Sequence, residues 1–165
     1  MRKKNRAGQF RRSGGGGPGG ARPPADRRIE FDGACGPVNP GGVATYGWRL
    51  LGPDGRVLAV NSGEVCRGPG ATNNVAEWQA LVFALRHLAG QGWKGTLQIC
   101  GDSRLVINQL NGLWGFRKQH LRPYRDECLR LLAGIDWVAV WVPREENRGA
   151  DALAKRAAVT GPGGG

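Results

Sequence analysis

Apolar residues recur at two different periods along the middle of the chain, and the two periods predict different elements. Alternation of apolar and polar positions predicts strands near residues 28–33, 46–51, 56–61, 96–101 and 136–142. Apolar spacings of three and four residues predict a helix over 76–88, with shorter helices after residue 102 and from residue 150. Strands interspersed with helices in this way indicate an α/β fold with a five-stranded mixed sheet flanked by helices.

Composition predicts one domain with a tail at each end of the chain. Residues 29–158 number about 130, which is near the common size of a single domain and enough for a core. Residues 1–28 carry nine Lys/Arg and one acid, and thus +8 of the formal net charge of +11. This glycine-rich segment is predicted to be disordered, and residues 159–165 to be a flexible tail. The basic segment is either an arm that binds phosphates or a solubilising extension.

Four acidic residues stand out because each falls in a different segment, at a place where one element meets another. Asp32 ends the first predicted strand, and Glu77 lies at the rim of the apolar face of the first helix. Asp102 stands at a strand-to-helix corner, and Asp151 opens the last helix. Carboxylates distributed in this way suggest a metal-dependent nuclease.

Each of the four acids also has a purely structural alternative. Asp32 is followed by glycine, which is typical of a tight turn. Glu77 lies three residues after Asn74, the spacing of a capping box. Asp102, or the serine after it, is a suitable helix N-cap. Asp151 suits the dipole at the start of a helix.

Taken together, the sequences around the acids carry a more specific signal. They read FDGACGPVNPGG, TNNVAE, GDSRLV and VPREENRGADALA, in that order. With this combination the chain resembles the type 1 ribonuclease H family over residues 29–158. The resemblance implies the ribonuclease H-like fold, and it implies that the catalytic residues and metal ligands are Asp32, Glu77, Asp102 and Asp151.

The chemistry of phosphodiester hydrolysis explains why such a site uses carboxylates. The reaction needs a nucleophilic water and a stabilised leaving oxygen, and two Mg²⁺ ions about 3.5–4 Å apart supply both. Oxygen ligands suit Mg²⁺. The resemblance therefore implies an endonuclease that cuts the RNA strand of RNA–DNA hybrids, such as RNA primers in DNA replication. It would use two Mg²⁺ ions, with Mn²⁺ as a substitute, and would leave 5′-phosphate and 3′-hydroxyl ends.

A protein of another class, a non-catalytic binder of hybrids or double-stranded RNA on the same fold, is the alternative. Loss of a catalytic acid would favour that alternative, and all four acids are present. Double-stranded RNA stays open as an additional substrate of an enzyme, because no long basic handle is apparent after Asp102.

The resemblance also implies a set of substrate-binding residues near the minor groove. Small residues and backbone groups can approach ribose closely, and asparagine can hydrogen-bond 2′-hydroxyls. The implied residues are Gly33, Cys35, Gly36, Asn39, Asn73, Asn74 and Arg104. Helix capping is the structural alternative for the two adjacent asparagines.

The loop before Asp151 departs from many members of the family, because it lacks their mobile histidine. Arg144, Glu145 or Glu146 is expected to assist product release or to stabilise transition-state charge, as in a subset of the family. The two histidines of the chain, at 87 and 120, have no partner at metal-ligand spacing, and we assign them no role.

Two aromatic residues after Asp102 have two open interpretations. Trp114 and Phe116 are followed by Arg117 and Lys118, a pattern that suits contact with a nucleic-acid strand through stacking and phosphate pairing. Packing in the core is the alternative, because large aromatic side chains favour burial.

Cysteine usage and the absence of targeting signals bear on the compartment. The four cysteines are too far apart for a zinc knuckle, and the sequence contains neither a secretory signal nor an apolar stretch of transmembrane length. Reduced thiols in a cytoplasmic monomer without membrane association are therefore expected.

Overall fold

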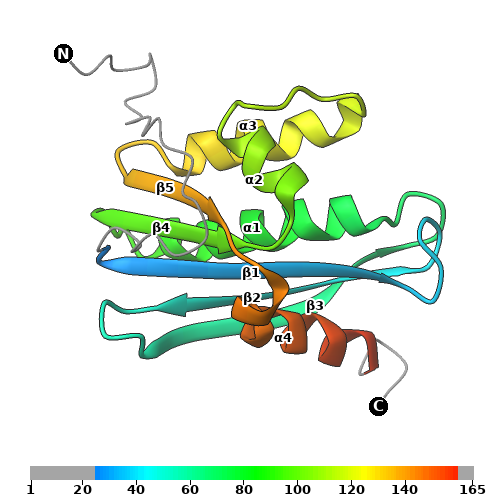
Figure 1. Cartoon of the computed structure of the whole chain (residues 1–165), viewed down its shortest axis with the longest axis horizontal. Coiled ribbons are helices and arrows are strands. Elements are labelled where there is room, and N and C mark those ends of the chain that lie inside the picture. The colour runs from blue at the N-terminus through cyan, green and yellow to red at the C-terminus, as the bar shows by residue number, and fades with distance from the viewer. Residues whose placement is uncertain (1–24, 160–165) are drawn as a thin grey trace.

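The computed structural model describes residues 25–159, which form a five-stranded sheet with helices on both faces (Figure 1). The sheet order is β3-β2-β1-β4-β5, with β1–β2 and β2–β3 antiparallel and β1–β4 and β4–β5 parallel. This confirms the predicted five-stranded mixed sheet. The strands are β1 (Arg27–Gly36), β2 (Val43–Leu51), β3 (Val57–Arg67), β4 (Thr96–Gly101) and β5 (Asp136–Trp141).

Three strands are longer than the apolar alternation predicts. β2 begins at Val43 and not at residue 46, and pairing with β2 extends β1 and β3. β1 continues past Asp32 to Gly36, and its residues 33–36 pair with residues 43–46 of β2. The prediction that Asp32 ends a strand is therefore wrong, and so is the alternative of an Asp-Gly turn. β3 likewise runs beyond residue 61, through a bulge, to Arg67. Its first residues, up to Val60, are the ones that alternation identified.

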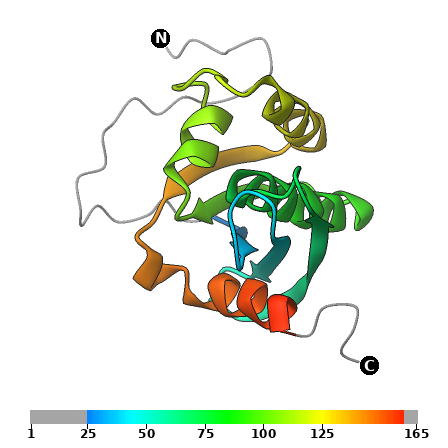
Figure 2. The same ribbon diagram turned by 90° about the vertical axis from the view of Figure 1, so that its right-hand side faces the viewer.

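The helices lie on opposite faces of the sheet (Figure 2). α1 packs against β1 and β2 on one face, with α2 and α3 beside it, and α4 packs against β2, β1 and β3 on the other. Two 3₁₀ turns, η1 and η2, precede α3 and α4. The bounds are α1 (Asn73–Gly90), α2 (Arg104–Leu110), η1 (Gln119–Leu121), α3 (Arg122–Leu131), η2 (Arg144–Glu146) and α4 (Arg148–Val159).

Most of the core lies between α1 and the sheet. Phe31 and Trp78 are fully buried there, and Phe116 joins them with 7% of its surface exposed. Trp114, by contrast, is 47% exposed. Core packing is therefore confirmed for Phe116 and wrong for Trp114, for which contact with a nucleic-acid strand stays a prediction.

The other face of the sheet is covered at close range by α4, through small residues. The hydroxyl of Thr45 donates a hydrogen bond of 2.9 Å to the carbonyl of Ala154. A Cβ atom on Gly47 would lie 2.6 Å from the carbonyl oxygen of Ala150 and 2.7 Å from the backbone nitrogen of Ala154. The missing side chain at Gly47 thus allows α4, and Asp151 with it, to approach the sheet.

The caps of α1 and α2 are hydroxyl residues, and the one of α2, Ser103, confirms one of the two predicted alternatives there. The Thr72 hydroxyl accepts from the backbone N–H of Val75 and caps α1, so Asn73 and Asn74 lie inside the helix. The alternatives of capping by these asparagines, and of a capping box with Glu77, are therefore wrong. Ser103 caps α2 in the same way, which leaves the side chain of Asp102 outside that role.

Several expectations fall at the ends of the chain. Residues 27 and 28, expected in the basic tail, belong to β1, whereas the expectations for residues 1–24 and 160–165 lie outside the described residues. The four cysteines, at positions 35, 66, 100 and 128, form no disulfide bond within the described residues. Within residues 25–159, every helix is too short or too polar to cross a bilayer.

Candidate active site

Three of the predicted carboxylates meet where β1, β4 and α1 converge. One carboxylate oxygen from each of Asp32, Glu77 and Asp102 lies within 4.8 Å of the others. Asp32 is in the middle of β1, and Asp102 directly follows β4, the parallel neighbour of β1. Because Phe31 pairs with Gly101, the two aspartates emerge at the same level of the sheet. Glu77 reaches them from the start of α1. We call these three residues the carboxylate cluster.

The close approach of α1 to β1 depends on the glycine after Asp32. A Cβ atom on Gly33 would lie 2.3 Å from the carbonyl carbon of Ala76 and 2.3 Å from the backbone nitrogen of Glu77. Real Cβ atoms do not come so near to backbone atoms, so only glycine permits this packing. The Asp-Gly pair therefore supplies one carboxylate and the space in which a second one reaches it.

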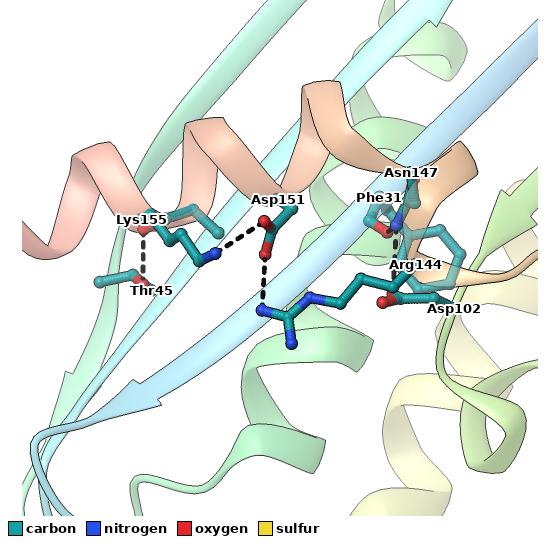
Figure 3. Close-up of polar contacts among 8 residues, drawn as sticks. Phe31, Thr45, Asp102, Arg144, Asn147, Asp151 and Lys155 are labelled. Carbon is teal, nitrogen blue, oxygen red and sulfur yellow. Dashed lines mark hydrogen bonds and ion pairs between the residues drawn. The ribbon is translucent and has the colours of Figure 1, made fainter.

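Asp151 approaches the cluster from α4, on the same face of the sheet as Asp32. Its Oδ1 lies 3.4 Å from an Nη of Arg144, and its Oδ2 lies 2.9 Å from Nζ of Lys155 (Figure 3). Burial raises the pKa of Asp151, but hydrogen bonds from Lys155 and Asp32 and the charge of Arg144 outweigh burial and bring that pKa below its ordinary value. The fourth acid is therefore ionised and paired with two cations.

Burial raises the pKa values of Asp32 and Glu77. Asp32 is 5% exposed, and burial, together with the charges of Asp102 and Asp151, raises its pKa to about 7 despite a hydrogen bond with Glu77 that lowers it. Burial, followed by the charge of Asp32, also raises the pKa of Glu77 well above its ordinary value. Repelling carboxylates held this close are stabilised either by protons or by a cation.

The donor set suits a divalent metal ion. All three clustered ligand atoms are carboxylate oxygens, which hard cations such as Mg²⁺ prefer. Oε2 of Glu77 is buried and makes no hydrogen bond with any described residue. A buried oxygen of this kind needs a partner, and a bound cation would provide one.

Asn147 is a residue of this site that sequence reasoning missed. Its side chain is fully buried, and its Nδ2 donates to the carbonyl of Phe31 at 2.9 Å and to Oδ1 of Asp102 at 3.1 Å (Figure 3). An asparagine just before a helix is typical of an N-cap. The sequence therefore suggests a helix cap, because it does not show which distant groups the amide contacts.

Arg104, predicted to bind substrate, is held beside the cluster by Trp141. Its guanidinium carbon lies 3.8 Å from the centre of the Trp141 ring, a cation–π contact. Nε1 of the same tryptophan donates to the backbone carbonyl of Asp102 at 3.0 Å. Trp141 was likewise not identified from the sequence, although it contacts both Arg104 and the backbone of Asp102.

The remaining predicted substrate residues fall into two adjoining segments. Oδ1 of Asn39 accepts a 3.1 Å hydrogen bond from the backbone N–H of Asn73, which joins the loop after β1 to the start of α1. Sγ of Cys35 donates to the carbonyl of Ala71, at 3.4 Å, in the same junction. These two bonds join the segments to which Gly36 and Asn74 belong, whereas Gly33 faces α1.

The other predicted assistants and the histidines are placed as follows. Of the residues of η2, Arg144 contacts the carboxylate of Asp151. The ring of His87 lies 5.0 Å from that of Trp48, and His120 is exposed in η1. Neither histidine belongs to the carboxylate cluster.

Comparison with known proteins gives consistent matches. A family model described as "Reverse transcriptase-like" matches residues 30–157. The chain is 42% identical over 128 residues to ribonuclease HI of Halobacterium salinarum, covering 77% of this chain and 61% of that protein. A bifunctional protein of Mycobacterium tuberculosis is 31% identical, and the chain spans 34% of it. The chain therefore spans between a third and three fifths of these relatives.

Solved structures are similar over nearly their whole length. The crystal structure of RNase H1 from Halobacterium salinarum has a TM-score of 0.73 and 39% identity, covering 81% of this chain and 97% of that one. LC11-RNase H1, solved in complex with an RNA/DNA hybrid, has a TM-score of 0.72 and 27% identity, covering 79% of this chain and 95% of that one.

Proposed function

The chain belongs to the type 1 ribonuclease H family, and from this we propose that it is an endonuclease that hydrolyses the RNA strand of RNA–DNA hybrids. The observation that carries the proposal is the carboxylate cluster, three acids from separate segments within 4.8 Å of one another. Burying acids that repel each other costs stability, so a structural role alone does not account for them. We assign the catalytic domain to residues 29–158, in agreement with the family match to 30–157.

We propose that Asp32, Glu77, Asp102 and Asp151 hold two Mg²⁺ ions, with Mn²⁺ as a substitute. Bound ions of this kind activate the attacking water and stabilise the leaving oxygen. The chain's own contribution is to present hard oxygen ligands in a site with little solvent, since Asp32 is 5% and Glu77 9% exposed. Asp151, less buried, would join them from α4.

Selection of the RNA strand is proposed for the junction between the loop after β1 and the start of α1. There Asn39 is bonded to the backbone of Asn73, so both segments present a single surface. Asparagine amides and the close backbone at Cys35 and Gly36 suit recognition of 2′-hydroxyls. Asn74 and Arg104 would complete this surface, and the hybrid complex of LC11-RNase H1 supports hybrid as the ligand.

Arg144 is proposed to take the place of the histidine found in many family members. Its contact with Asp151, at 3.4 Å, supports this role because a cation there can compensate the aspartate when a metal ion or the product leaves. The four cysteines, which form no disulfide bond within the described residues, support a reducing compartment such as the cytoplasm.

The DNA strand is proposed to contact the loop after α2. This loop borders a cavity of about 820 Å³, which is lined by Trp114, Arg117, Lys118 and residues of α1 and α2. Stacking of a base on an aromatic ring contributes about 1–3 kcal/mol. We expect Trp114→Ala to weaken hybrid binding at least fivefold in a metal-free anisotropy titration, with little change in Tm.

Phe116→Ala is the matched control for Trp114, because Phe116 is two residues away and 7% exposed. Its replacement is expected to lower the free energy of unfolding by about 3 kcal/mol. Unchanged hybrid affinity in Trp114→Ala would remove this loop from the binding surface.

The function is tested with end-labelled RNA presented alone, in an RNA–DNA hybrid and in an RNA duplex. Each substrate is incubated with Mg²⁺, Mn²⁺ or chelator. We expect internal cuts in the hybrid that need metal and are lost in Asp102→Asn but kept in Asp126→Asn, a change of an exposed residue on α3. Tight hybrid binding without cuts under either metal would instead favour a non-catalytic binder, and equal cleavage of the RNA duplex would widen the substrate class.

A further inference from the structure

We propose that Asn147 is the positioning residue that sets the relative placement of three of the four carboxylates. This rests on the proposed function and deepens it, because none of the substrate contacts or metal ligands assigned above includes Asn147. The residue lies between η2 and α4 and is fully buried.

Of the hydrogen bonds of Asn147, three each reach the segment of a different acid, and Figure 3 shows the two that its side chain makes. Its Nδ2 donates at 2.9 Å to the carbonyl of Phe31, the residue before Asp32. The same nitrogen donates at 3.1 Å to Oδ1 of Asp102. Its backbone carbonyl accepts, at 3.1 Å, the N–H of Asp151. One residue therefore joins β1, the end of β4 and the start of α4.

The chemistry of these bonds requires an amide at this position. A carbonyl and a carboxylate only accept, so both protons of the Nδ2 group are used and the orientation of the amide is fixed. Serine has one proton to donate, and aspartate at neutral pH has none. Asparagine is the short neutral side chain that can bridge both acceptors.

The bond to Asp102 also selects a geometry for the carboxylate. An N–H that donates to one carboxylate oxygen restrains rotation of the group. Oδ1 of Asp102 is engaged by Asn147, which leaves Oδ2 as the oxygen free to face a bound cation. Neighbouring groups that orient metal ligands in this way commonly change metal affinity or activity by about 10- to 100-fold when removed.

Simple capping of α4 does not account for the buried side chain. In an N-cap, the side-chain oxygen accepts from a helix N–H. Oδ1 of Asn147 makes no hydrogen bond with any described residue, and the whole polar connection runs through Nδ2. Burying an amide group costs free energy unless hydrogen bonds compensate it. Here both protons of Nδ2 are donated to the segments of the acids.

The experiment compares Asn147→Ala with Asn111→Ala. Asn111 is the matched control because its Nδ2 also donates to a backbone carbonyl, that of Ala139 at 3.1 Å, on the far side of α2. Two quantities are measured: the Mg²⁺ concentration that gives half of the maximal rise in Tm, and kcat and KM for a hybrid of fixed length.

For Asn147→Ala we expect the Mg²⁺ midpoint to rise about tenfold and kcat to fall 10- to 100-fold, with KM within about threefold of wild type. Asn111→Ala is expected to lower Tm but to leave the Mg²⁺ midpoint and kcat within about twofold. If Asn147→Ala gives no cooperative transition, Asn147→Ser, which keeps one donor, is measured in the same way and is expected to show the same shifts.

Wild-type Mg²⁺ midpoint and kcat in a folded Asn147 variant would overturn the proposal, and so would a rise in KM with kcat unchanged. The Mg²⁺ titration does not depend on cleavage. A wild-type protein that cuts no hybrid but binds Mg²⁺ more tightly than Asn147→Ala would therefore refute the proposed function and leave the positioning role standing.

Discussion

Replacing Gly33 by alanine is expected to lower the free energy of unfolding by about 3 kcal/mol and kcat for hybrid cleavage about 100-fold. The added Cβ would lie 2.3 Å from backbone atoms of Ala76 and Glu77, and a backbone cannot move aside as a flexible side chain does. α1 would therefore shift away from β1 and take the carboxylate of Glu77 out of the cluster. Displacement of a catalytic group by about 1 Å is enough for a loss of this size.

The control for Gly33→Ala is a glycine of α1 that has space around it. A Cβ on Gly90 meets nothing within 4 Å, so Gly90→Ala is expected to keep wild-type kcat and to leave stability the same or slightly higher. Urea unfolding and steady-state cleavage measure both variants. A Gly33→Ala protein with wild-type stability and kcat would show that the packing of α1 on β1 does not set the position of Glu77.

The contrast between Gly33 and Gly90 also marks what the sequence can and cannot predict. Periodicity located all five strands and the long helix, because each buries one face and the burial is recorded in the spacing of apolar residues. The ends of β1 and β3 were missed because their last residues are held by pairing with β2 and not by their own pattern. The requirement for glycine at position 33 likewise comes from the helix packed against it, and the local sequence does not show it.

The site likewise has residues that the sequence predicts and residues that only the fold identifies. The four acids were predicted from the resemblance of their flanking sequences, and three of them form the cluster in the structure. Asn147 was missed because its partners lie 116 and 45 residues away along the chain. Trp114 and Phe116 have similar neighbours in sequence, and only the fold decides that one packs in the core while the other is 47% exposed.

The second large effect concerns pH in the absence of metal. We expect the contribution of Asp32 to the free energy of unfolding of the metal-free protein to fall by about 3 kcal/mol as pH rises from 4 to 7. The pKa of Asp32 is about 7 in the folded protein, against 3.8 for the free group. Between these values the folded state holds a proton that the unfolded state has released, so stability is greatest at low pH and is lost as pH rises.

Urea unfolding at several pH values, in metal-free buffer and again with saturating Mg²⁺, measures this effect. Asp32→Asn is the matched variant, because it keeps the size of the side chain and removes its charge. We expect its metal-free stability to lack the Asp32 contribution between pH 4 and 7. A wild-type curve that coincides with that of Asp32→Asn over this range would contradict a raised pKa for Asp32.

Mg²⁺ should counteract the loss, because a cation replaces the proton as the charge that neutralises Asp32. Binding to the folded state adds about 2.7 kcal/mol at a concentration 100 times Kd. The gain is expected to be larger above pH 7, where Asp32 has no proton to be displaced, and to decline toward pH 4. The same buried charges that weaken the metal-free fold at neutral pH thus favour metal binding, and Asn147 and Gly33 act by holding those charges together.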